Sequence, residues 1–325
     1  MIASSSACSA PLDKSKRIAF IGGGNMASAM IGGLLANAYP PTNIVVSEPT
    51  PERAAHLEAL FNINVASTNE DAVQFTGHPS RKPADIVILA VKPQVMKLAA
   101  SALAKAVQST RPLVISVAAG IRTVDLNRWL SSDENGSILP SARNIAIVRA
   151  MPNTPALVSE GATGLFAGLG VTHQQKIETY NVIASVSSRT YWVEQENLID
   201  VVTALSGSGP AYFFFMIECL EQAAHQLGLP KDVARGLAAQ TAFGAGKMAV
   251  TSKHEPRELR LQVTSPDGTT EAAIRTLETA GTRKIFAQAV VDAMKRSMEL
   301  GELFGKDSAP VILSSESTCD GASDR

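Results

Sequence analysis

The sequence predicts an α/β protein in two parts: a first half built on a parallel β-sheet and a second half made only of helices. Two observations predict this division. Up to residue 195, short apolar runs of strand length alternate with helical segments. From residue 196 onward, apolar residues recur with the 3.6-residue period of helices almost without interruption. We therefore expect a sheet domain over 16–195 and a helical domain over 196–305, with disordered tails at 1–15 and 306–325.

Composition excludes several classes of protein. The chain has 325 residues, 45% apolar and 18% charged, and a net charge of −1, which gives no electrostatic reason to bind nucleic acid or an anionic membrane. No apolar run approaches the roughly 18 residues of a membrane span. Three distant cysteines argue against a disulfide framework and fit a reducing compartment, so we expect the cytoplasm. The five histidines are scattered, and we expect no metal site.

The first expected strand, residues 16–21 (KRIAFI), leads into a glycine-rich turn. The turn and the start of the next helix read Gly-x-Gly-x-x-Ala, from Gly22 to Ala27. Gly22 would allow the tight turn, Gly24 would let the backbone approach a pyrophosphate, and Ala27 would permit close helix–strand packing. A structural turn between any strand and helix is the alternative. The strand–turn–helix context favours a Rossmann-type dinucleotide-binding domain.

Later strands repeat the pattern of a sheet that is covered on both faces. Segments 85–91 and 113–117 are continuous apolar runs, and the further expected strands are 43–47, 145–151 and 190–193. Ligands of such sheets bind past the carboxyl ends of the strands, so the turns at 90–93 and 118–120 are candidate walls of a cofactor site. Lys92 could meet a phosphate or ribose there, or remain a solvated lysine.

Glu48 ends the second strand, near the position expected for a ligand of the ribose 2′-hydroxyl. A carboxylate would hydrogen-bond that hydroxyl and repel a 2′-phosphate, which favours NADH. Arg53 follows in the next turn or helix and could offset this effect for NADPH. The residues themselves lean slightly toward NADH.

The second half is expected to form helices over 197–205, 210–227, 231–250 and about 270–300. The segment 206–209 (SGSG) interrupts this pattern. Close approach of a ligand and a simple kink both explain it. The segment 213–216 (FFFM) is apolar on all sides, so it is covered either by a partner chain or by an ordinary core.

Five segments together resemble the Δ1-pyrroline-5-carboxylate reductase family. They occur in the family's order and read IGGGNMA (21–27), DIVILAVKPQ (85–94), VRAMPNTPALVSEGAT (148–163), DVVTALSGSGPAY (200–212) and VTSPDGTTEAAIRTLE (263–278). The family usually has Gly-Gly where Asp267-Gly268 stands here. Asp tolerates a left-handed backbone better than most residues, so we expect the turn to survive.

The resemblance implies a set of site residues. The implied cofactor contacts are Gly22, Gly24, Asn25, Met26, Ala27, Glu48, Asn69, Ala90, Val91, Lys92, Pro93, Ala118 and Ala119, with Asn153 and Pro155 nearby. The implied substrate contacts are Glu196, Ser265, Gly268, Thr269 and Thr270. Thr270 would be the catalytic residue, because its hydroxyl could donate to the imine nitrogen. The alternative task for Thr269 or Thr270 is to cap a helix.

The implied reaction is the reduction of 1-pyrroline-5-carboxylate to L-proline, the last step of proline biosynthesis. The resemblance implies NADPH, and often NADH, as cofactor, and a homodimer with intertwined helical domains that often assembles into larger rings. Two alternatives stay open at this point: a β-hydroxyacid-dehydrogenase-like oxidoreductase and a non-enzymatic NAD(P)-sensing protein.

Overall fold

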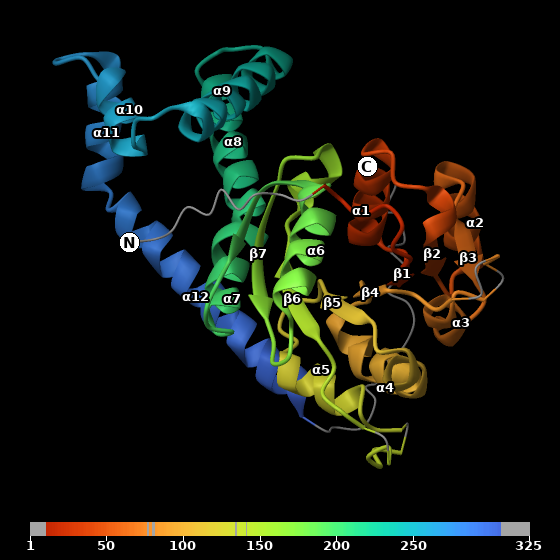
Figure 1. Cartoon of the computed structure of the whole chain (residues 1–325). Helices are drawn as coiled ribbons and strands as arrows, with labels where there is room; N and C mark the ends of the chain where they lie inside the picture. Colours follow the sequence, from red (N-terminus) through yellow and green to blue (C-terminus); the bar gives the residue numbers. More distant parts are fainter. Residues whose placement is uncertain (1–10, 77, 80–81, 134, 141, 307–325) are drawn as a thin grey trace, which may run out of the picture.

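The computed structural model describes residues 11–76, 78–79, 82–133, 135–140 and 142–306. Within these ranges one eight-stranded sheet has the order β3-β2-β1-β4-β5-β6-β7-β8 (Figure 1). Its strands are β1 (Ile18–Ile21), β2 (Ile44–Ser47), β3 (Asn64–Ala66), β4 (Ile86–Leu89), β5 (Leu113–Ser116), β6 (Ile147–Met151), β7 (Gly161–Ala167) and β8 (Ser187–Trp192). Neighbours from β3 to β6 are parallel, whereas β7 runs antiparallel to β6 and parallel to β8. The first six strands thus have the order of a dinucleotide-binding fold.

Helices cover both faces of the sheet, as the apolar strands require. The helices of this half are α1 (Asn25–Ala36), α2 (Pro51–Phe61), α3 (Asn69–Gln74), α4 (Pro93–Thr110), α5 (Thr123–Trp129) and α6 (His173–Ala184), with single 3₁₀ turns at Pro41–Asn43 and Thr154–Val158. Alternate residues of β1 enter two separate cores: Ile18 and Phe20 pack with α1 and α6, and Ala19 and Ile21 pack with α3, α4 and α5.

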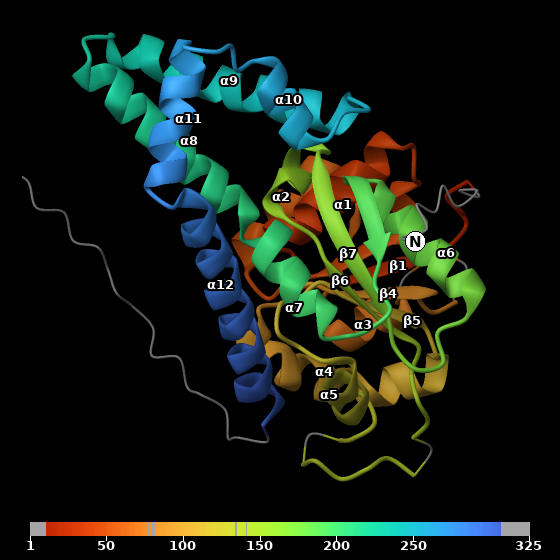
Figure 2. The same ribbon diagram turned by 90° about the vertical axis from the view of Figure 1, so that its left-hand side faces the viewer.

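The second half is all helical, as predicted. Its elements are α7 (Leu198–Val202), a π-helical turn (Thr203–Gly207), α8 (Gly209–Gln226), α9 (Lys231–Thr251), α10 (Pro256–Gln262), α11 (Thr269–Thr279) and α12 (Thr282–Gly305). Figure 2 shows α8 and α9 reaching away from the sheet and α12 returning alongside it. Two expectations were wrong. The SGSG segment does not end the helix, because a π-helical turn carries it into α8, and the long last helix is split at Gly281, where φ is 73°.

The apolar run at 213–216 is not an ordinary core. Within α8, all of which is described, Gly209 alone is buried, and Phe213, Phe214 and Phe215 are about two-thirds exposed. The helical stretch Leu198–Gln226 is also long and apolar enough, by length and composition only, to cross a membrane, with a mean hydropathy of 1.3. This corrects the expectation that no segment meets that criterion. Such a surface needs a cover, and a partner chain is one.

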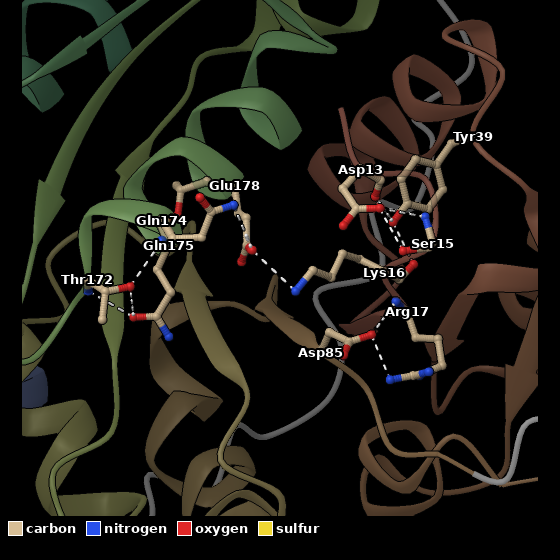
Figure 3. Close-up of polar contacts among 11 residues, drawn as sticks. Asp13, Ser15, Lys16, Arg17, Tyr39, Asp85, Thr172, Gln174, Gln175 and Glu178 are labelled. Atoms are coloured by element: carbon tan, nitrogen blue, oxygen red, sulfur yellow. Dashed lines mark hydrogen bonds and ion pairs between the residues drawn. The ribbon is translucent and has the colours of Figure 1, made fainter. Parts of the chain in front are cut away.

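Ordered structure begins before the expected domain boundary at residue 16. The Tyr39 hydroxyl donates to the Lys16 carbonyl over 2.6 Å, and Leu12 packs against the core. Ion pairs Lys16–Glu178 (3.2 Å) and Arg17–Asp85 (2.8 Å) lie beside them, around the amino ends of β1 and β4 (Figure 3). A cavity of about 330 Å³ opens here, at the sheet edge opposite the glycine-rich turn. Residues 1–10 and 307–325 of the predicted tails lie outside the described residues.

Candidate functional site

The glycine-rich turn has the geometry that its sequence predicts. Gly22 has φ +96°, and a Cβ added to it would lie 2.9 Å from Val91 and 3.0 Å from the carbonyl oxygen of Ala90. No side chain fits there, because both the backbone conformation and the space exclude it. A Cβ on Gly24, in contrast, would meet no described atom within 4 Å. The turn is therefore closed on the side of β4 and open at the start of α1.

The amino end of α1 is available to an anion. Gly24 is its N-cap and has no side chain to cap the helix. Asn25 is exposed, Met26 is half-buried, and Ala27 is fully buried against the core. The unpaired amides and the helix dipole at such an end attract a phosphate group. The site thus fits the pyrophosphate of a dinucleotide.

Glu48 lies directly beneath this turn. Its Oε2 accepts a hydrogen bond from the Gly23 amide and its Oε1 accepts one from the Thr50 amide, both 3.0 Å long. Burial raises the pKa of Glu48, but the amides of Thr50 and Gly23 and the charge of Arg53 outweigh it, so the net shift of the pKa is downward. The carboxylate is therefore charged at neutral pH and fixed at the rim of the turn, where the sequence placed a ribose ligand.

Arg53, the group predicted to offset that charge, stands at the edge of the same site. Its Nη1 lies 3.5 Å from Glu48 Oε2, and its side chain is 53% exposed while that of Glu48 is 4% exposed. The contact is long and solvated, so it holds Arg53 only weakly. Arg53 is thus free to turn toward an anion at this end of the site.

The remaining predicted cofactor residues follow neighbouring strand ends. Ala90 and Val91 follow β4, where the Ala90 amide donates to the Ile21 carbonyl over 2.9 Å. Lys92 is the N-cap residue of α4 and Pro93 is its first residue. Ala118 and Ala119 follow β5. Asn69 begins α3, and its Oδ1 accepts from the Ser47 hydroxyl over 2.7 Å. The fold therefore gathers these residues at the carboxyl edge of the sheet.

Glu196, predicted to contact substrate, has a full set of partners within the protein. Its Oε1 accepts from the Thr123 amide (2.7 Å) and from Arg149 Nη1 (3.0 Å), and its Oε2 accepts from the Thr123 hydroxyl (2.8 Å). The Arg149 side chain is 3% exposed, and this carboxylate pairs with its buried guanidinium. Glu196 thus fixes the start of the helical half to α5 and β6, a role that the sequence did not predict.

Asn153 also joins the two halves, although the sequence placed it beside the cofactor. It is buried, its Oδ1 accepts from the Ala162 amide (2.9 Å), and its Nδ2 donates to the Ser206 carbonyl (3.0 Å). The Ser206 carbonyl belongs to the π-helical turn. A Cβ on Gly207 in that turn would lie 2.6 Å from the Met151 side chain. Gly207 therefore serves close packing against β6, whereas a Cβ on Gly209 would meet no described atom within 4 Å, so the kink and the ligand interpretations of SGSG both stay open.

The predicted substrate loop, Ser265 to Thr270, links α10 and α11. The Gly268 amide donates to the Ser265 carbonyl over 3.1 Å, and Asp267 between them has φ +58°. Gly268 is the N-cap of α11, and among the described residues no side chain caps this helix. Neither Thr269 nor Thr270 is therefore used as the cap that the alternative reading assigned to them.

One chain does not bring this loop to the glycine-rich turn. Figure 1 shows α10 and α11 set apart from the sheet, on the far side of α8 from α1. The cofactor residues thus form one group and the loop residues Ser265, Gly268, Thr269 and Thr270 form another. Among the described residues, no group of three or more His, Cys, Asp or Glu side chains is arranged to hold a metal ion.

Known proteins resemble this chain over nearly its whole length. Residues 196–300 match the family described as pyrroline-5-carboxylate reductase dimerisation. A pyrroline-5-carboxylate reductase of Pseudomonas aeruginosa is 42% identical over 290 residues, which are 89% of this chain and 98% of that protein. The chain belongs to the pyrroline-5-carboxylate reductase family. This membership decides against both alternatives, the β-hydroxyacid-dehydrogenase-like enzyme and the NAD(P) sensor.

Solved structures support the same family and its type of cofactor. A pyrroline-5-carboxylate reductase from Coxiella burnetii superposes with a TM-score of 0.77 at 39% identity, covering 88% of this chain and 98% of that one. The Plasmodium falciparum pyrroline carboxylate reductase, solved with NADP bound, gives 0.73 at 26% identity, covering 89% and 99%. Residues 17–120 also match the family described as NADP oxidoreductase coenzyme F420-dependent. The pyrroline-5-carboxylate reductase fold thus places an NADP-binding type of domain before a dimerisation domain.

Proposed function

We propose that this reductase forms L-proline from 1-pyrroline-5-carboxylate at a site assembled from the glycine-rich turn and the loop Ser265–Thr270. The carbon of the C=N bond gains a hydride and the ring nitrogen gains a proton that comes ultimately from solvent. The observation that carries the proposal is a pair of helix amino ends, those of α1 and α11, whose N-cap residues Gly24 and Gly268 have no side chain to cap them. One suits the pyrophosphate of a dinucleotide and the other suits the carboxylate of the substrate. When bound, the reduced nicotinamide supplies the hydride.

The loop supplies the groups that hold and polarise the substrate. The amides at the start of α11 would accept the carboxylate. The Thr270 hydroxyl would donate to the ring nitrogen and so favour the charge that develops as the C=N bond is reduced. Ser265, Gly268 and Thr269 would shape the cradle. Such chemistry needs little beyond orientation and polarisation, so no histidine is required for acid–base work.

The geometry of one chain supports a homodimer as the working form. The loop lies away from the glycine-rich turn of its own chain, and α8 exposes Phe213, Phe214 and Phe215 in the region matched by the dimerisation family. A second copy would cover this apolar surface and bring its loop to the cofactor end of the first. Larger rings built from such dimers, and a location in the cytoplasm, stay predictions.

Different residues of the site favour NADH and NADPH. The same residues would hold either dinucleotide: the turn Gly22–Ala27, Asn69, Ala90, Val91, Lys92, Pro93, Ala118 and Ala119. The fixed charge of Glu48 favours the 2′-hydroxyl of NADH, whereas the exposed Arg53 favours the 2′-phosphate of NADPH. We propose that the enzyme accepts both. For Glu196, the contacts with Arg149 and Thr123 support a positioning role in place of direct substrate contact.

The test is the oxidation of NADPH and of NADH by the purified protein with 1-pyrroline-5-carboxylate, for wild type, Thr270→Ala and Thr270→Ser. We expect turnover by the wild type, a fall in kcat of at least about tenfold for Thr270→Ala, since one positioned donor is lost, and partial recovery in Thr270→Ser. Absence of wild-type turnover would refute the reaction. Equal turnover by wild type and Thr270→Ala would remove the role of Thr270 alone.

A further inference from the structure

The substrate loop contains a strained residue. Asp267 has φ +58°, the left-handed region, as the third residue of the turn from Ser265 to Gly268. This is the position at which a type II turn favours glycine. Asparagine and aspartate tolerate the region better than other residues but still populate it less than glycine does. The turn therefore needs a contact that offsets this preference.

Glu271 provides that contact from one turn into α11. Its Oε2 accepts a hydrogen bond of 2.7 Å from the Asp267 amide. Glu271 is the third residue of α11, where a negative charge also interacts favourably with the helix dipole. A charge-assisted hydrogen bond of this kind is about twice as strong as a neutral one. The bond ties the amide of the strained residue to α11 and so stabilises the observed conformation.

Glu271 also determines which amides remain for a ligand. The Asp267 amide is taken by Glu271 and the Gly268 amide by the Ser265 carbonyl. The helical ladder begins with the Ala272 amide, which donates to the Gly268 carbonyl over 3.2 Å. The amides of Thr269, Thr270 and Glu271 lie between these two points, before the first hydrogen bond within the helix. The arrangement presents one short stretch, with two hydroxyls and three amides, to the substrate.

We infer that Glu271 is a positioning residue of the reductase: it stabilises the left-handed turn at Asp267 so that Thr269 and Thr270 are held ready for the substrate. The inference rests on the proposed function of the loop. It makes Asp267 and Glu271 a compensating pair. The carboxylate at 271 is needed because residue 267 is not glycine.

The test is a double-mutant cycle made of Glu271→Ala, Asp267→Gly and the double variant, with Glu271→Gln as the control that keeps an acceptor oxygen. In the wild-type background we expect Glu271→Ala to raise KM for 1-pyrroline-5-carboxylate about five- to tenfold, with kcat and KM for NADPH within about twofold. Glu271→Gln keeps an acceptor oxygen but not the charge, so its substrate KM should fall between those of wild type and Glu271→Ala. In the Asp267→Gly background, Glu271→Ala should change the substrate KM by no more than about twofold, because glycine adopts the turn without help.

Three results would overturn the inference. A lower substrate KM in Glu271→Ala would mean that the carboxylate competes with the substrate. An equal effect of Glu271→Ala in both backgrounds would separate Glu271 from the turn. Equal losses in both cofactor and substrate KM would indicate general damage to the fold.

Hydrogen–deuterium exchange of the peptide 263–271 gives a readout that needs no turnover. Exchange should accelerate about five- to tenfold in Glu271→Ala and much less in the double variant. If the wild type failed to reduce 1-pyrroline-5-carboxylate, the proposed function would fall while this measurement still decided the role of Glu271. Unchanged exchange in Glu271→Ala would refute that role.

Discussion

Replacing Glu48 by Gln is expected to shift the enzyme from NADH toward NADPH. The Glu48 carboxylate accepts one amide on each oxygen, from Gly23 and Thr50, whereas glutamine offers a single acceptor oxygen. One amide therefore loses its partner. A hydrogen bond to a charged group contributes about 1.5–3 kcal/mol, and the Arg53 contact, being exposed, contributes at most about 1 kcal/mol.

Part of the lost hydrogen-bond energy lowers the stability of the turn in the cofactor-free protein. We therefore expect the binding of NADH to weaken by about 1–2 kcal/mol, which corresponds to a five- to thirtyfold higher KM for NADH. For NADPH the same loss is offset, because the repulsion between Glu48 and the 2′-phosphate disappears as well. The ratio of kcat/KM for NADPH to that for NADH should rise about tenfold. Glu52→Gln, an exposed acid in the first turn of α2, is the matched control. A ratio that changes less than twofold in Glu48→Gln would refute the reasoning.

The Glu48→Gln substitution is also expected to change how the stability of the protein depends on pH under acidic conditions. The folded pKa of Glu48 is lowered, so its charge adds stability at pH values above the unfolded pKa of about 4.3. That contribution is lost as the pH falls through the lower, folded pKa. The difference in Tm between wild type and Glu48→Gln should therefore be constant from pH 8 to about 5 and shrink below about pH 4.

Two further outcomes follow from the fold. Gly22→Ala should raise KM for both dinucleotides at least about tenfold with little change in substrate KM, because a methyl group at φ +96° would meet Val91 and the Ala90 carbonyl. Titration of cofactor fluorescence measures this, and unchanged binding would contradict it. Phe214→Asp should dissociate the dimer, because it places a charge in the apolar surface of α8. Sedimentation measures the mass of the variant. A monomer without turnover would support a site shared between chains, whereas a fully active monomer would rule such a site out.

The sequence predicted those strands and turns that can be identified from their own residues, without knowledge of their neighbours in the fold. The strands β1 and β4 are continuous apolar runs, β2 and β5 are apolar up to a final serine, and all four are buried along their whole length; such runs have no other stable place in an α/β fold. The glycine-rich turn was predicted for the same reason, since Gly22 and Gly24 have distinct tasks that the motif encodes.

The missed elements depend on neighbours far away in the sequence. β7 contains Gly161 and Gly164, which weaken any strand prediction. A Cβ on Gly164 would lie 2.7 Å from Val202 of α7, and one on Gly161 would lie 2.7 Å from the Val186 carbonyl. These glycines are needed for close packing that only the folded chain reveals. β3 was missed because it has three residues, none of them buried.

The site residues also divide into those that local sequence rules located and those whose contacts depend on the fold. Residues at strand ends were located correctly by the rule that parallel strands share a carboxyl edge. The resemblance implied that Glu196 contacts substrate and that Asn153 lies near the cofactor, and these roles stay predictions. The protein partners Thr123, Arg149 and Ser206 were not predicted, because they lie 47 to 73 residues away along the chain, a separation that the sequence pattern does not bridge. Buried polar side chains take whatever partner satisfies them, and that partner is a property of the fold.

These contacts explain how the dimerisation half can be both extended and fixed in position. The backbone of α12 crosses the turn after β5 so closely that a Cβ on Gly301 would lie 2.9 Å from the Gly120 carbonyl. Asn153 and Glu196 tie the first helical turns to β6 and α5. The base of the helical half is therefore rigid against the cofactor half, while α8 to α11 reach outward with their apolar side chains uncovered. A loop carried on such an arm does not meet its own glycine-rich turn, so the proposed role of Thr270 requires that a partner chain bring the two together.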